Sequence, residues 1–146
     1  MTATLGVTGT RNLTTEQAEQ VRYEIWELDR TGTHWHIGCT KGVDALVRKL
    51  VTNGSKTLHT AKGGQAWQLQ KRSREMVDAL AAANGTLHAW VNKPCPSNLT
   101  VTSWQGSGTW GTMCYAIAKG VKVELHWLIE PQEEPDWLEQ KQLSLV

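Results

Sequence analysis

The sequence of 146 residues has no phenylalanine, few cysteines and no apolar run near the roughly 20 residues needed to cross a bilayer. Its three cysteines, Cys39, Cys95 and Cys114, are odd in number and widely spaced, which excludes a disulfide framework. No C-x-x-C or H-x-x-x-H spacing occurs, so no metal site is expected. The N-terminus lacks the basic and then apolar layout of a secretory signal. We therefore expect a cytoplasmic protein with no membrane association.

The chain also has little net charge, with a formal value of +1. Nucleic-acid binding usually needs a broad basic face, so a nucleic acid is not expected as a partner. The charge is nevertheless uneven, because residues 41–74 hold eight basic residues and one acid, whereas 124–146 hold six acids and one base. The basic segment is either a wall facing an anion or a solvated helix surface. Lys41 and Arg72 are the best candidates for the first role.

Strand-like and helix-like segments alternate along the sequence. Apolar runs predict strands near 3–7, 34–37, 57–60, 87–91 and 121–127, and helical periodicity follows each of the first four. Thr14 and Gln17 form a capping box at the start of the first helix. This alternation is typical of an α/β fold: a Rossmann-like, doubly wound, mainly parallel sheet of about five strands, with helices on both faces and strand order 3-2-1-4-5. We expect one domain over 1–130 and an acidic C-terminal tail over 131–146.

Three glycine-containing loops follow strand-like runs and precede helix-like ones. In a parallel sheet such loops meet at the carboxyl ends of the strands, where ligands bind. Backbone N–H groups of glycine turns and helix N-termini favour anions, above all phosphates. The sequence therefore predicts a site for a phosphorylated small molecule, built from these loops and Arg72: Thr8, Gly9, Thr10, Arg11, Gly38, Cys39, Lys41, Gly42, Asp44, Arg72, Gly106, Ser107, Gly108 and Thr109.

Some side chains in these loops allow more than one interpretation. Residues 106–111 match G-x-G-x-x-G by letter but follow the fourth strand, so we interpret them as a phosphate-binding turn with Thr109 as the helix N-cap. Trp104 and Trp110 bracket this turn and either stack on a base or fill the core. Asp44 either binds a ribose or interacts with the macrodipole of its helix. Cys39 has no neighbouring base in the sequence, so a nucleophilic role is not favoured.

The ordered segments VTGTR, GCTKGVDALV, KRSREM and GSGTWGTMCYAIAKGVKV resemble the SLOG superfamily, in particular its YpsA-related members and the DprA- and LOG-like proteins. The resemblance covers about residues 4–127. It implies a Rossmann-like domain that forms homodimers or higher oligomers and binds nucleotides or related ligands. Arg72 and Met76 stand where LOG enzymes carry the arginine and methionine of a motif, and Ser73 replaces the lysine between them.

One departure from the LOG pattern bears on catalysis. Thr112 stands where LOG enzymes carry a catalytic glutamate, and a threonine cannot act as a carboxylate base. We therefore expect a binding module, a carrier or sensor of a nucleotide or nucleotide-like phosphate compound, rather than an enzyme. Two alternatives stay open: a LOG-like phosphoribohydrolase or other nucleotide hydrolase that uses Asp44, and a carrier of a pterin phosphate like the molybdenum-cofactor carriers. No further cofactor is assigned.

Overall fold

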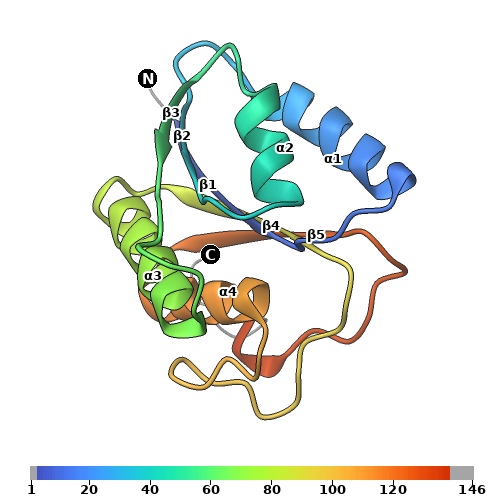
Figure 1. Cartoon of the computed structure of the whole chain (residues 1–146), viewed down its shortest axis with the longest axis vertical. Coiled ribbons are helices and arrows are strands. Elements are labelled where there is room, and N and C mark those ends of the chain that lie inside the picture. The colour runs from blue at the N-terminus through green and yellow to red at the C-terminus, as the bar shows by residue number, and fades with distance from the viewer. Residues whose placement is uncertain (1–2, 139–146) are drawn as a thin grey trace.

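The computed structural model describes residues 3–138 and contains a five-stranded, entirely parallel sheet in the order β3-β2-β1-β4-β5. This confirms the expected Rossmann-like α/β fold and strand order. Figure 1 shows α1 and α2 on one face of the sheet and α3 and α4 on the other. In chain order the elements are β1 (Thr4–Gly9), α1 (Thr15–Leu28), β2 (His34–Ile37), α2 (Val43–Leu50), β3 (Ser55–Leu58), α3 (Ala66–Ala82), β4 (Thr86–Val91), α4 (Gly108–Ala118) and β5 (Lys122–Trp127).

The core lies in two clusters, one on each face of the sheet. Trp35 and Trp90 are fully buried among the residues of the α1 and α2 layer, and Trp110 is buried in the α3 and α4 layer. The indole N–H groups of the first two have carboxylate acceptors: Asp29 for Trp35 and Glu24 for Trp90. Tryptophans thus supply the large aromatic volume that phenylalanine would otherwise provide.

The strands differ slightly in their bounds from the sequence-based expectation, and β3 runs over Ser55–Leu58 instead of 57–60. β1 continues through Thr8 and Gly9, which pair with Ala89 and Trp90 of β4. α1 ends at Leu28, because Asp29 caps it and its carboxylate accepts hydrogen bonds from backbone N–H groups of residues 52–54. The capping box of Thr14 and Gln17 is confirmed.

The first part of the expected acidic tail packs on the domain. Leu138 is buried in the α3 and α4 core cluster, and the Trp137 ring lies 6.4 Å from the Trp110 ring in an edge-to-face arrangement. Residues 139–146 lie outside the described part of the chain. Between residues 3 and 138, no helix is long and apolar enough to span a bilayer.

Candidate functional site

A cavity of about 470 Å³ lies at the carboxyl ends of β1 and β4, where the connections leave the sheet in opposite directions. We call it the strand-end pocket. Such a switch point is the usual ligand site of an open parallel sheet. The structure brings ten of the residues expected at the site together along its wall: Thr8, Gly9, Thr10, Arg11, Asp44, Arg72, Gly106, Ser107, Gly108 and Thr109.

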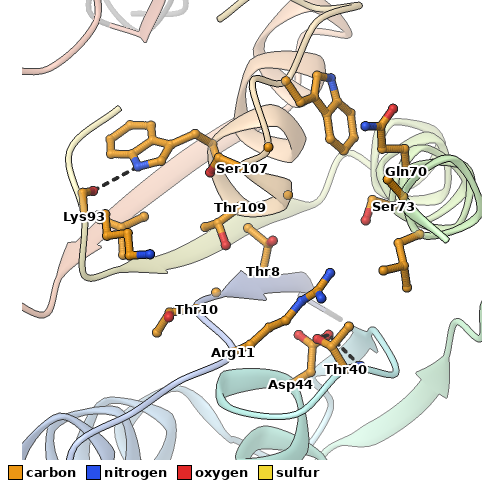
Figure 2. Close-up of a pocket in the computed structure, with 18 of the residues that line it drawn as sticks. Thr8, Thr10, Arg11, Thr40, Asp44, Gln70, Ser73, Lys93, Ser107 and Thr109 are labelled. Atoms are coloured by element: carbon orange, nitrogen blue, oxygen red, sulfur yellow. Dashed lines mark hydrogen bonds between the residues drawn. The ribbon is translucent and has the colours of Figure 1, made fainter. Parts of the chain in front are cut away.

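The N-terminus of α4 forms one side of the strand-end pocket. Ser107 is the N-cap, and its hydroxyl oxygen accepts from the backbone N–H of Trp110 at 3.2 Å. The expectation that Thr109 caps this helix is therefore wrong, because Gly106, at φ +76°, turns the chain early enough for the helix to begin at Gly108. The first N–H groups of a helix have no carbonyl partner within it. Figure 2 shows the Thr109 hydroxyl in the pocket close to Thr8.

The third glycine of the G-x-G-x-x-G match has a packing role. A Cβ at Gly111 would overlap the indole of Trp104, which lies directly against α4. By contrast, a Cβ at Gly108 would meet no atom within 4 Å. Gly111 thus allows the Trp104 indole to pack closely on α4, whereas Gly108 lines the pocket and has open space beside it.

A buried ion pair closes the opposite side of the pocket. Nη1 of Arg72 on α3 lies 3.7 Å from Oδ2 of Asp44 on α2, and the two side chains are 10% and 5% exposed. Burial raises the pKa of Asp44, although hydrogen bonds from Thr40 and the charge of Arg72 act in the other direction. Oδ1 of Asp44 and Nε of Arg72 have no hydrogen-bond partner among the residues that the structure describes. The pair is therefore incompletely satisfied.

Four of the expected residues do not line the pocket, although three of them support its walls. Gly38 leaves room for the Asp44–Arg72 pair, since a Cβ there would overlap the guanidinium. The Cys39 sulfur accepts from Arg72 Nη1 at 3.3 Å. Gly42 has φ +77° and packs on the backbone of residues 10 and 11. Lys41 is exposed outside the pocket.

Sequence reasoning missed several residues of the wall. Lys93 and Asn92 follow β4 directly, a position that could have been recognised as the end of a parallel strand. On the side of α3, the pocket is lined by residues at helical spacing in the first turns of the helix. The sequence did not indicate them because it did not reveal that the helix starts at Ala66. The further lining residues are Asn12, Thr40, Gly64, Ala66, Leu69, Gln70, Ser73, Val91, Asn92, Lys93, Trp104 and Trp110. Figure 2 shows Lys93, Gln70 and Ser73 around the same space as Thr8 and Arg11.

The two tryptophans beside the glycine turn are committed to packing. Trp104 is 3% exposed and Trp110 is 2% exposed, and the Trp110 N–H donates to the Lys93 carbonyl at 3.0 Å. Both line the pocket, but their burial leaves no open ring face on which a base could stack.

Thr112, at the position of the LOG glutamate, is buried outside the pocket. Thr112 is 1% exposed, does not line the pocket, and donates its hydroxyl to the Gly108 carbonyl at 2.6 Å. Among residues 3–138 no group of three or more His, Cys, Asp or Glu is arranged to hold a metal ion.

Comparison with known proteins gives a likeness of fold. No protein-family model matches the chain, and no curated protein matches it by sequence. It is similar to DNA processing protein A (DprA) from Streptococcus pneumoniae, with 16% identity and a TM-score of 0.62 over 99% of this chain and 56% of that one. It is also similar to DprA from Helicobacter pylori, with 13% identity and a TM-score of 0.59 over 97% and 72% of the two chains. The chain thus spans little more than half of the S. pneumoniae protein.

These similarities agree with the SLOG resemblance at the level of a Rossmann-like domain and leave its LOG and molybdenum-cofactor branches without support. They also correct one expectation. The H. pylori structure describes a single-stranded DNA binding mode, so a protein that contains this fold has a nucleic-acid partner. The exclusion of nucleic acids from the near-neutral net charge was therefore wrong. Net charge averages over the chain and misses the local excess of basic residues in 41–74.

Proposed function

We propose that this chain binds a nucleoside phosphate unit, with the phosphate in the strand-end pocket at the N-terminus of α4. The observation that carries the proposal is the convergence of a helix N-terminus with three cationic side chains on one cavity. Arg11, Arg72 and Lys93 all line it, and Asp44 is the one acid among its lining residues. Helix dipole, unpaired N–H groups and guanidinium groups all favour an anion with several oxygens.

The pocket also has the size and polarity for the rest of a nucleotide. Its volume of about 470 Å³ lies within the range of small-molecule sites. The Thr10 hydroxyl bonds to the backbone of Asn12, and Figure 2 shows the hydroxyl groups of Thr8 and Thr109 close to each other in the pocket. Such groups can donate to phosphate oxygens or accept from a sugar hydroxyl. The exposed Arg11 side chain, also labelled in this view, lines the pocket from the loop after β1.

Binding without hydrolysis is the role that these residues support best. Asp44 is held by Thr40 and Arg72, and the buried Thr112 supplies no carboxylate. A general base must reach the attacking water, and a carboxylate that is 4% exposed and paired with Arg72 is poorly placed to do so, although its Oδ1 has no partner among the described residues. A carrier or sensor of a nucleoside phosphate needs only the anion site.

The variant Gly108→Val tests the site. A Cβ at this position meets no protein atom within 4 Å, so the new side chain fills ligand space rather than disturbing the fold. Ala118→Val is the matched control, because it adds a branched side chain at the exposed far end of the same helix. Calorimetry with deoxythymidine monophosphate should show at least about tenfold weaker binding for Gly108→Val, the cost of one lost charged hydrogen bond, and no change for Ala118→Val.

Equal affinity of Gly108→Val and wild type would refute the assignment of the pocket. Mass spectrometry of the native protein provides a second test, since a phosphorylated ligand retained by wild type should be absent from Gly108→Val. Release of free base from nucleoside monophosphates by the wild-type protein would instead show a hydrolase.

A further inference from the structure

Trp67 differs from the buried tryptophans of the core. It lies in the first turn of α3 and is 61% exposed. Its indole N–H donates to Oε1 of Gln65 at 3.0 Å, so the one polar atom of the ring has a partner and the ring is held in position. The broad faces of the indole stay available to a planar group from outside the chain.

A second cavity, of about 310 Å³, lies against this ring. We call it the Trp67 cavity. Exposed Lys62 and Lys71 both line it, and its one acid is Glu75, whose carboxylate lies 4.0 Å from the Lys71 ammonium in a solvent-exposed pair. Lys62 has no ion-pair partner among residues 3–138. An exposed aromatic ring that lines the same cavity as two lysines is suited to a ligand with both a flat face and negative charge.

The Trp67 cavity adjoins the strand-end pocket. Arg72 lines both cavities. The first turns of α3 present one set of residues to the strand-end pocket and another to the Trp67 cavity: Ala66, Leu69, Gln70 and Ser73 for the first, and Trp67, Gln68, Lys71 and Glu75 for the second. The loop before α3 also contributes to both, with Gly64 on one side and residues 60–62 on the other.

We propose that the chain binds a single strand of nucleic acid across the N-terminus of α3, with one nucleotide in the strand-end pocket and a neighbouring base stacked on Trp67. This rests on the proposed function and extends it from one nucleotide to an oligonucleotide. Lys62 and Lys71 meet the phosphates that flank the stacked base. The stacking face is sequence-tolerant, because every base has a π face.

The charges around the two cavities favour a single strand of nucleic acid as the ligand over an uncharged, apolar partner. Of the eight basic residues in segment 41–74, Lys62, Lys71 and Arg72 line one or both cavities, and Arg11 and Lys93 add their charges to the strand-end pocket. The acids that line the two cavities, Asp44 and Glu75, are paired with Arg72 and Lys71 respectively. A local basic track of this kind accommodates a phosphate backbone even when the whole chain carries a net charge near zero.

The test compares a mononucleotide with an oligonucleotide. Fluorescence anisotropy with labelled oligodeoxythymidylate of about 10 nucleotides measures strand binding, and calorimetry with deoxythymidine monophosphate measures the pocket alone. Trp67→Ala should weaken oligonucleotide binding about tenfold, the loss of one base-aromatic stack, and leave mononucleotide binding unchanged. Trp67→Phe should retain most of the affinity because it keeps a flat ring. Trp26→Ala, which removes a 75% exposed indole from α1 on the other face of the sheet, is the matched control and should change neither.

A second readout addresses the lysines. Replacing Lys62 and Lys71 together by glutamine should reduce the slope of log affinity against log salt by about 1.4, or about 0.7 for each lost phosphate contact. If Trp67→Ala binds the oligonucleotide as tightly as wild type while Gly108→Val loses both ligands, the Trp67 platform is refuted and the proposed function stands. If Gly108→Val loses neither ligand, the proposed function itself fails. An equal loss of mononucleotide and oligonucleotide in Trp67→Ala would also overturn the platform.

Discussion

Replacing Arg72 with methionine should destabilise the protein far more than a surface change, because it leaves the Asp44 carboxylate buried without its countercharge. At 3.7 Å and an effective dielectric constant of about 20, the attraction between the pair is about 4.5 kcal/mol. Removing one partner of a buried pair typically costs about 3–5 kcal/mol. The hydrogen bonds of Arg72 to Cys39 and Ser73 are lost as well. We expect Arg72→Met to lower the free energy of unfolding by about 4 kcal/mol.

Urea denaturation followed by circular dichroism measures this free energy, and the double variant Asp44→Asn/Arg72→Met gives the control. Removing the stranded charge should restore most of the loss and leave a net cost of about 1–2 kcal/mol, because the amide oxygen of the new asparagine would still accept the hydrogen bonds that Thr40 now donates to Asp44. A cost below about 1 kcal/mol for Arg72→Met alone, or a double variant no more stable than the single one, would refute the uncompensated-charge argument.

Two further predictions concern titratable groups away from the pocket. Asp29→Asn should lower the free energy of unfolding by about 3 kcal/mol, because an amide NH₂ would face backbone N–H groups of the 52–54 loop. Urea denaturation checks this, and the exposed Glu19→Gln should cost less than about 0.5 kcal/mol. Burial and the neighbouring His126 lower the pKa of His88 from 6.5 to about 4, so the unfolded chain binds the extra proton and stability falls as the pH drops from 6.5 to 4. His88→Asn should flatten this part of the profile of melting temperature against pH, and an equally steep profile would contradict the assignment.

Local signals made the elements of the sheet predictable, because apolar runs and helical spacing showed the alternation of strands and helices and the capping box gave the start of α1. The strand order followed from the usual topology of a doubly wound sheet. Parallel topology then placed the three loops at one edge, which led to ten lining residues of the strand-end pocket. The superfamily resemblance was also accessible from the ordered motifs, at the level of the fold that the DprA structures share.

The exposure of individual tryptophans was not predictable from the sequence. Trp104 lies beside the glycine turn yet packs on Gly111, whereas Trp67, for which the sequence predicted no role, is an exposed ring in the first turn of α3. The position of a tryptophan in the sequence does not determine which residues pack against it in the folded chain. It also does not determine whether its side of a helix faces the core or the solvent. The same reason hid the α3 residues of the pocket, since the helix begins before its periodic apolar pattern does.

The Asp44–Arg72 pair joins helices from opposite layers of the sandwich, α2 from one face of the sheet and α3 from the other, past the end of β2 at Gly38. A ligand anion that draws on the Arg72 guanidinium therefore competes with the bond between the two layers. The guanidinium of Arg72 thus belongs both to the wall of the pocket and to the contact between the two helical layers.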